Sequence, residues 1–282
     1  MKKINLLVAV APLLLVGLFS APVSADNSWG KYHWDISSAD SNTSPLELAD
    51  NLSTDSWKIS HRIASDSWNG AVLQSGDSVL KNAIVPGAGN DNCGPTLGRI
   101  EVCNDFYGDT RWLGIASIWA TRGKSNHIVQ GVVKVNDTYF SLDYYNTDAW
   151  RDFVMCQEVG HTFGLDHQDI VFDNANLGSC MDYTNDPDGT VYGQLSNVFP
   201  NQHDYDMMVE IYSHLNSTTD GGGGNGKGGG KKLKKAGGAD IDLNNPSAWG
   251  QAIRQDSQGR NTLFERALSN GQVLVTHVIW AY

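Results

Sequence analysis

Residues 156–167 read Cys156-Gln157-Glu158-Val159-Gly160-His161-Thr162-Phe163-Gly164-Leu165-Asp166-His167. On an α-helix, side chains four residues apart lie one above the other, so Gln157 and His161 can face one ion while Glu158 faces a water molecule beside it. Gly164 can adopt the left-handed conformation that ends a helix, which turns the chain and brings His167 back as a third ligand. Three protein ligands and one water are the open coordination of a catalytic metal ion, whereas a structural zinc site has four protein ligands.

Gln157 has two competing interpretations. Its side-chain oxygen reaches about as far as the distal nitrogen of a histidine, so it can complete the site as a neutral ligand. We then expect weaker binding, because zinc prefers imidazole nitrogen to an amide oxygen. Alternatively, Gln157 marks a degenerate site that has lost metal and activity. The presence of Glu158, both histidines and Gly164 favours a metal site.

A second segment follows the helix and reads Ser179-Cys180-Met181-Asp182-Tyr183. The two segments together resemble the metzincin superfamily of zinc endopeptidases. In that superfamily the zinc helix reads H-E-x-x-H-x-x-G-x-x-H and a turn with a buried methionine follows it. Gln157 departs from this pattern at the first histidine. The resemblance spans most of residues 45–215, but only residues 157–183 are specific to the motif.

The resemblance implies an α+β fold, with a mixed twisted sheet, an active-site helix and a Met-turn subdomain. It implies zinc held by His161, His167 and Gln157. Glu158 would be the general base that takes a proton from water and delivers it to the leaving amine. Met181 would form an apolar floor under the ligands, and Tyr183 would stabilise the oxyanion. The alternative for Tyr183 is an aromatic side chain that only packs in the turn.

The resemblance also places the substrate on a strand, Leu113-Gly114-Ile115-Ala116, as the substrate-facing edge of the sheet. An extended peptide would add a strand there. The implied function is a secreted zinc-dependent endopeptidase acting on protein or peptide substrates. The alternative is a catalytically weak or inactive protein of the same fold that binds peptides or surfaces.

Composition divides the chain into four parts. Residues 1–25 predict a secretory signal peptide, because Lys2 and Lys3 precede a short apolar run and small residues follow it. Residues 26–219 are long enough for one domain with a sizeable core. Residues 220–238 are rich in Gly and Lys and indicate a flexible linker. Residues 239–282 predict a small β-rich module, too short for independent stability, which we expect to dock on the catalytic domain or a partner.

Four cysteines form an even set, which suits an exported protein: Cys93, Cys103, Cys156 and Cys180. Three pairings are possible. We favour Cys93 with Cys103, which closes a short loop, and Cys156 with Cys180, which ties the helix to the Met turn. Buried free thiols are the alternative, and the absence of C-x-x-C spacing argues against structural zinc.

The charge balance restricts the partners. Residues 26–219 contain 10 Lys and Arg against 26 Asp and Glu, which argues against nucleic-acid binding. No later segment is long and apolar enough to span a membrane. The run Lys231–Lys235 can contact an anionic surface, although most such runs are only solvated. Acidic groups around Asp186 and at Asp169, Asp173 and Asn174 suggest calcium, and are equally typical of turns.

Periodicity predicts the remaining elements. Helices are expected at 53–68 (capped by Ser53 or Thr54), from Asn146 or Thr147 through His161, and at 203–215. Strands are expected at 80–85, 99–104, 113–120 and 127–135, with a further strand at 272–278 after a hairpin turn. Six histidines have no two-ligand spacing with one another and are assigned to surface or core: His33, His61, His127, His203, His214 and His277.

Overall fold

The structure is a computed structural model. It describes residues 27–29, 32–35, 45–87, 89, 92–123, 126–212 and 241–281. The predicted signal peptide and the Gly/Lys-rich segment with its lysine run lie outside these residues. Among the described helices, none is both long and apolar enough to cross a membrane.

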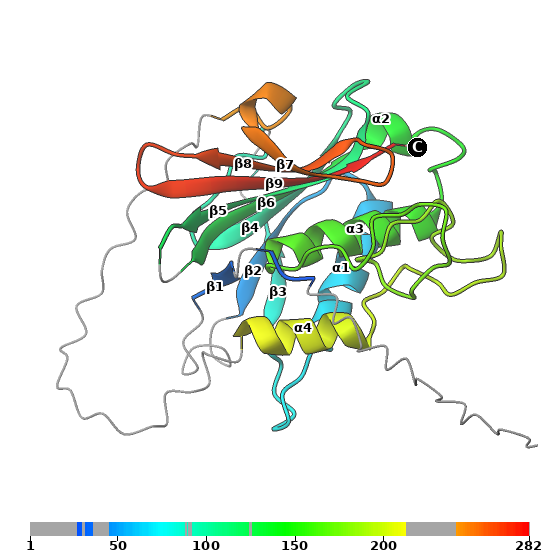
Figure 1. Ribbon diagram of the computed structural model, residues 1–282, viewed down its shortest axis with the longest axis horizontal. Coiled ribbons are helices and arrows are strands. Elements are labelled where there is room, and N and C mark those ends of the chain that lie inside the picture. Colours follow the sequence, from blue (N-terminus) through cyan, green and yellow to red (C-terminus); the bar gives the residue numbers. More distant parts are fainter. Residues whose placement is uncertain are drawn as a thin grey trace, which may run out of the picture.

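A single mixed sheet of nine strands organises the described chain (Figure 1). Its strands are β1 (His33–Trp34), β2 (Leu46–Asn51), β3 (Asn82–Pro86), β4 (Arg99–Asp105), β5 (Trp112–Thr121), β6 (His127–Asn136), β7 (Gln251–Gln255), β8 (Asn261–Ala267) and β9 (Gln272–Trp280). The order is β3-β2-β4-β6-β5-β9-β8-β7, and β1 pairs with β6. The pairs β2–β3, β2–β4 and β4–β6 are parallel. The pairs β5–β6, β5–β9, β8–β9 and β7–β8 are antiparallel. The predicted mixed α and β architecture is therefore confirmed.

The helices are α1 (Asp55–Trp68), α2 (Asp137–Phe140), α3 (Asp148–Thr162) and α4 (Gln202–Tyr212), with a short 3-10 helix at Pro246–Ala248. The predicted caps are confirmed. The side chain of Thr54 accepts a hydrogen bond from the amide of Trp57, and that of Thr147 accepts one from Trp150. Each bond satisfies an amide that has no partner inside its helix, which fixes where the helix begins.

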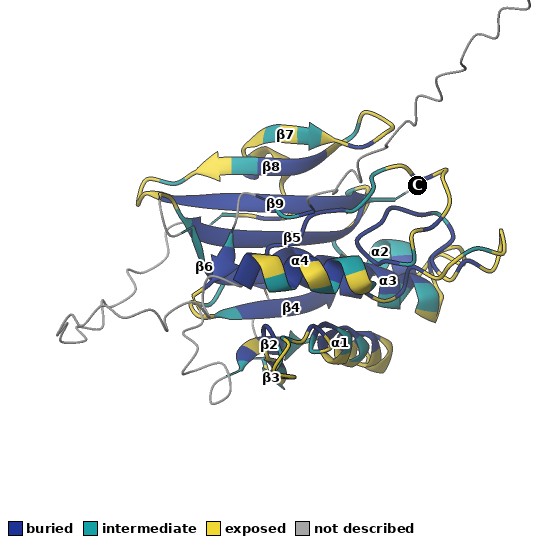
Figure 2. Ribbon diagram, turned by 60° about the horizontal axis from the view of Figure 1, so that its bottom comes forward, coloured by how far each residue is buried: buried dark blue, intermediate teal, exposed yellow. Residues whose placement is uncertain are grey.

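The central strands of the sheet are buried on both faces. One face packs against α1 and α3, and its core includes Val154 and Val159 of α3 together with Val273, Val275 and Ile279 of β9. The opposite face forms a second cluster, in which Trp112, Ile115 and Trp119 of β5 meet Leu274 and Val278 of β9, covered by Leu243 and Trp249. β5 and β9 are consequently buried along almost their whole length (Figure 2). Strand alternation assigns successive residues of β9 to opposite cores.

The predicted position of β5 at the sheet edge is wrong. β9 pairs with it from Trp112↔Trp280 to Thr121↔Gln272, so β5 is an interior strand between β6 and β9. The C-terminal residues form β7, β8 and β9, which extend the main sheet, so a separate small module is not confirmed. We call β7, β8 and β9 the C-terminal strands. An unpaired edge exposes amide and carbonyl groups, and β9 satisfies those of β5.

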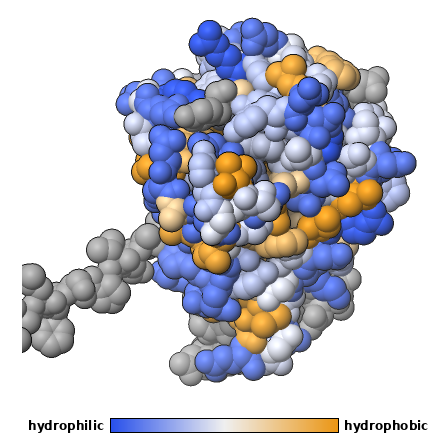
Figure 3. All heavy atoms as spheres, turned by 90° about the vertical axis from the view of Figure 1, so that its right-hand side faces the viewer, coloured by the Kyte–Doolittle hydropathy of each residue, from blue (hydrophilic) through white to orange (hydrophobic). Residues whose placement is uncertain are grey.

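Both favoured disulfides are present, Cys93–Cys103 and Cys156–Cys180. The second joins α3 to the turn at residues 179–183, which we call the Met turn. The loop between α3 and α4 also exposes large apolar residues: Leu177, Val191, Tyr192, Leu195 and Phe199. Figure 3 views the molecule from the side of this loop, where apolar side chains are scattered among polar ones. Such scattered exposure is ordinary for a folded surface.

The close packing of α3 predicts the effect of Gly160→Ala. A Cβ atom at this position would lie 2.5 Å from Cζ2 of Trp68 and 2.8 Å from Sδ of Met181. We expect overpacking to cost about 1–3 kcal/mol, more than the ~1 kcal/mol that alanine gains in helix propensity. Urea unfolding measures the difference. A variant at least as stable as the parent would contradict this packing.

Candidate metal centre

Two of the predicted ligands come from the end of α3 and the turn after it. His161 lies in the last turn of the helix, and Gly164 has φ +99°, the predicted left-handed conformation. The amide of Leu165 donates to the carbonyl of Gly160 at 3.3 Å, which closes the helix end. A side chain at Gly164 would also collide with the carbonyl oxygen of Tyr32, at 2.1 Å from its Cβ. The glycine therefore allows the sharp turn that returns His167 to His161.

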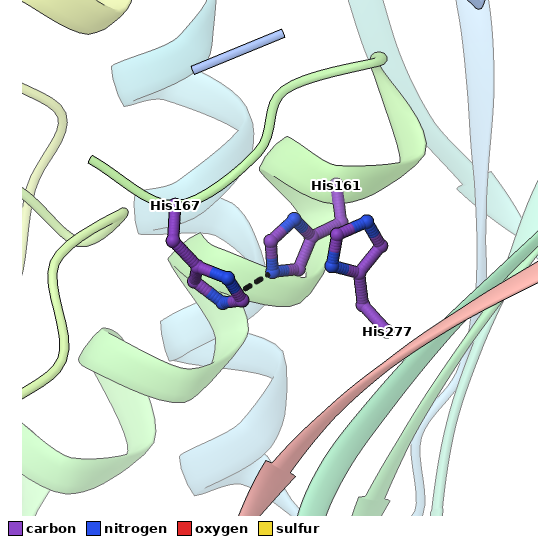
Figure 4. A group of neighbouring side chains, drawn as sticks. All are labelled: His161, His167 and His277. Carbon is purple, nitrogen blue, oxygen red and sulfur yellow. Dashed lines mark hydrogen bonds between the residues drawn. The ribbon is translucent and has the colours of Figure 1, made fainter. Parts of the chain in front are cut away.

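A third histidine completes the cluster. One ring nitrogen from each of His161, His167 and His277 lies within 4.8 Å of the other two, and we call these residues the His cluster (Figure 4). The Nε2 atoms of His161 and His167 are 3.0 Å apart, and the ring of His277 stacks on that of His161 with centroids 3.8 Å apart. Tetrahedral zinc with bonds of about 2.0–2.1 Å separates neighbouring ligand nitrogens by about 3.4 Å. The His161–His167 pair is close to this separation, whereas the stacked ring of His277 would have to turn before its nitrogen pointed at a shared ion.

The unsatisfied nitrogens also fit a metal. His277 is fully buried, and within the described chain neither of its ring nitrogens has a hydrogen-bond partner. A buried polar group without a partner is costly, so an ion at this position would remove the cost. Burial lowers the pKa values of His161 and His277 well below their ordinary range, and it also lowers that of His167. Neutral imidazoles are the form that binds metal.

Neighbouring groups orient two of the rings. Nδ1 of His161 lies 2.9 Å from the carbonyl oxygen of Leu165, which leaves Nε2 for an ion. Nδ1 of His167 lies 3.5 Å from the carboxylate of Asp166, which also pairs with Arg254 of β7. Burial raises the pKa of Asp166, but its hydrogen bonds and the adjacent positive charges outweigh burial and hold that pKa well below its usual range. Asp166 is therefore an anionic partner for the ligand ring.

Glu158 lies on the same side of α3 as His161, three residues before it. It is fully buried, and neither carboxyl oxygen has a hydrogen-bond partner among the described residues. A Cβ atom at Gly114 would lie 2.8 Å from its Oε1, so the glycine of β5 leaves room for the carboxyl group. Burial raises the pKa of Glu158 well above its ordinary value. A buried carboxyl group without a partner, on the same side of α3 as His161, is chemically available to a ligand that enters this part of the fold.

Gln157 is placed differently from the two predicted histidine ligands. Its Nε2 donates to the carbonyl oxygen of Cys180 at 2.8 Å, which ties the helix to the Met turn beside the Cys156–Cys180 disulfide. Its Oε1 is buried and has no partner within the described chain. The three converging side chains are therefore histidines, and coordination by Gln157 stays a prediction.

The Met turn packs beneath the cluster. Met181 is fully buried, with its sulfur beside Gly160 of α3. The ring of Tyr183 lies 4.4 Å from that of His167, and its hydroxyl donates to the carbonyl oxygen of Val278 at 3.4 Å. Tyr183 is thus a neighbour of the cluster, and its hydroxyl is held by β9.

Asp204 of α4 organises the segments around the cluster, a role that no sequence motif indicates. Its carboxylate accepts hydrogen bonds from Ser179 Oγ at 2.6 Å, Gln168 Nε2 at 2.7 Å and Asn27 Nδ2 at 3.2 Å. These donors come from the Met turn, the loop after His167 and the N-terminal residues. Buried carboxylates that accept several hydrogen bonds fix their donors in place. The amide of Asp166 also donates to the carbonyl of Asn27.

His277 was assigned to surface or core, and the structure places it in the cluster. One signal was available in the sequence, where Val273, Val275 and Ile279 share its strand face. A histidine in an apolar row needs a partner, which makes it a candidate ligand. The partner itself could not be identified without the pairing of β9 with β5.

The other predicted site residues have local roles. Gly114 borders Glu158, and Ala116 lies opposite His277 in the strand register. The carboxylate of Asp186 accepts hydrogen bonds from the amides of Val191 and Tyr192. That of Asp169 accepts bonds from Val171 and Asn174. These bonds are those of ordinary turns, and calcium binding stays a prediction.

Comparisons with known proteins add no identity. No family model matches the chain, and a search of curated proteins found no relative. Function is therefore inferred from the geometry of the His cluster.

Asp182 in the Met turn predicts a pH dependence of stability. Burial raises its pKa from 3.8 to about 7, so the folded protein retains a proton that the unfolded chain loses. The corresponding stability is present below about pH 4 and is lost as the pH rises toward 7. In Asp182→Asn, the loss of unfolding free energy between about pH 4 and 8 should shrink by roughly 1–4 kcal/mol. Equal pH profiles from urea unfolding would contradict this.

The cluster predicts that His277→Ala weakens zinc binding. Removing one of three imidazoles leaves two, so the dissociation constant should rise by a factor on the order of 100. Competition with a chromophoric chelator measures the change. Thr276→Val is a matched control, since Thr276 lies on the same strand and its hydroxyl contacts Ser117 instead of the cluster. Parent-like affinity in His277→Ala would remove His277 from the site. Gln157→Ala, measured alongside, tests whether Gln157 also binds.

Proposed function

We propose that this protein is a secreted zinc-dependent endopeptidase of the metzincin type. The single observation that carries the proposal is the position of Glu158, a buried carboxyl group without a partner, one helical turn from His161 of the His cluster. Three imidazoles form a donor set that suits zinc, and a carboxyl group beside them suits proton transfer. The two disulfides are consistent with an exported protein.

The residues have distinct roles in this proposal. A zinc ion held by the cluster would supply Lewis acidity toward a peptide carbonyl and would acidify water. Glu158 takes a proton from the attacking water and passes it to the leaving amine. Tyr183 donates a hydrogen bond to the oxygen on which negative charge develops. Asp166 and the carbonyl of Leu165 hold the rings of His167 and His161 in the orientation that ligands need.

One observation favours the second candidate, a catalytically weak or inactive protein of this fold that binds peptides or surfaces. His161, His167, His277 and Glu158 expose between 0% and 8% of their surface, and β9 covers the strand predicted to bind substrate. Such burial restricts the access of water and substrate to the cluster, whereas a catalytic zinc keeps one coordination position for them.

Glu158→Gln separates the two candidates. The variant keeps the volume of the side chain and cannot accept a proton, so it should retain about one zinc per chain and lose about 10²- to 10⁴-fold in hydrolysis of an unfolded protein substrate. Metal analysis and a general protease assay measure both quantities. Glu47→Gln, which neutralises a more exposed carboxylate on β2, should behave as the parent. A zinc-loaded parent without hydrolysis, or an active Glu158→Gln, would overturn the proposal.

A further inference from the structure

The C-terminal strands touch the site at three separate points. His277 of β9 completes the His cluster, the carbonyl of Val278 accepts from the hydroxyl of Tyr183, and Arg254 of β7 pairs with Asp166 beside His167. These contacts engage a metal-binding ring, the proposed oxyanion donor and a ligand-orienting carboxylate. The C-terminal strands therefore contact the residues around the His cluster and also pair with β5 beside it.

The backbone of β9 lies where the proposed function requires a substrate. It runs antiparallel along β5, with Ala116 opposite His277 and Ile115 opposite Val278. A polypeptide that adds to a sheet edge binds through the same main-chain hydrogen bonds, so β9 and an extended substrate cannot both pair with β5. The Tyr183 hydroxyl already donates to a peptide carbonyl of β9, which is the kind of group that it would contact in a substrate.

The C-terminal strands join the rest of the sheet at one strand boundary, and the apolar side chains of β9 belong to both cores. Within the described chain, β7, β8 and β9 join the other strands through one pairing, that of β9 with β5. Strands β3, β2, β4, β6 and β5 would keep their own pairings if β9 left. The buried imidazole of His277 weakens the attachment when it has no partner and strengthens it when an ion is bound.

We propose that β9 is a displaceable strand that closes the metal centre, and that its departure from β5 opens both the metal and the substrate edge. This inference concerns regulation of the site described under the proposed function and rests on it. The closed arrangement holds His277 on the metal and the Val278 carbonyl on Tyr183. In the open arrangement His277 leaves with β9, so a zinc ion would be held by His161 and His167, and an extended polypeptide pairs with β5 in place of β9.

A reversible lock tests the proposal in the full-length protein. Ser117 and Thr276 are opposite each other in the β5–β9 register, with their hydroxyl oxygens 2.9 Å apart. Their neighbours Ile115, Trp119, Leu274 and Val278 belong to the cluster on the sheet face away from α3. The double variant Ser117→Cys/Thr276→Cys can therefore form a cross-strand disulfide without touching the metal position.

Two rates are compared between the oxidised and mildly reduced forms of this double variant. One is the release of zinc to excess chelator, and the other is hydrolysis of an unfolded protein. We expect both to be at least tenfold slower in the locked form. The parent treated with the same reductant controls for the native disulfides. Ser117→Ala/Thr276→Val controls for loss of the hydroxyl contact.

Each outcome decides the question. Slower zinc release in the locked form, with hydrolysis in neither form, supports the displaceable strand and overturns the proposed peptidase. Equal hydrolysis in the locked and reduced forms keeps the peptidase and overturns the displaceable strand. Equal zinc release in both forms also overturns it, whether or not the protein hydrolyses peptides.

Discussion

The pairing of β9 with β5 is the interaction on which the metal centre depends. In a strand, successive side chains alternate between faces, so the register decides whether His277 points toward α3 or away from it. A slip of one residue would place Thr276 or Val278 at the cluster and send the imidazole to the opposite core. Apolar side chains on both faces of β9 hold the observed register. The third imidazole is therefore positioned by hydrophobic packing on a strand far from α3 in the sequence.

This arrangement links metal binding to the docking of the C-terminal strands. Their apolar side chains stabilise the docked state through burial, while the unpartnered imidazole of His277 opposes it. An ion shared by His161, His167 and His277 would turn that cost into a bond between the two parts of the chain. The same ion would then bind His161 of α3 and His277 of β9, and so link the two elements. Closure and metal occupancy would rise and fall together.

Local patterns were sufficient to predict much of the scaffold. The caps Thr54 and Thr147, the left-handed Gly164 and the hairpin before β9 follow from side-chain chemistry within a few residues. The disulfide pairs follow from spacing and an expected contact between the zinc helix and the Met turn. These features depend on interactions that are short in sequence. Periodicity also located β3, β4, β5 and β6 to within a few residues.

Long-range pairing could not be predicted in the same way. The strand at Leu46–Asn51 was not anticipated, because its role depends on parallel partners on both sides. The assignment of β5 to an edge failed because β9, although predicted as a strand, could not be given a partner. The position of His277 depends on that partner. Gln157 stands where the motif has its first histidine. The third imidazole of the cluster is that of His277, on a strand that no local motif connects to α3.

The most direct measurement is the position and ligands of zinc in a crystal of the zinc-loaded full-length protein, obtained by anomalous scattering at the zinc edge. A single peak is expected between the three imidazoles, with nitrogen ligands from His161, His167 and His277 at about 2.0–2.1 Å. A zinc ion bound by His161 and His167 with His277 outside its coordination, or no zinc at the cluster, would contradict the metal centre described for this fold.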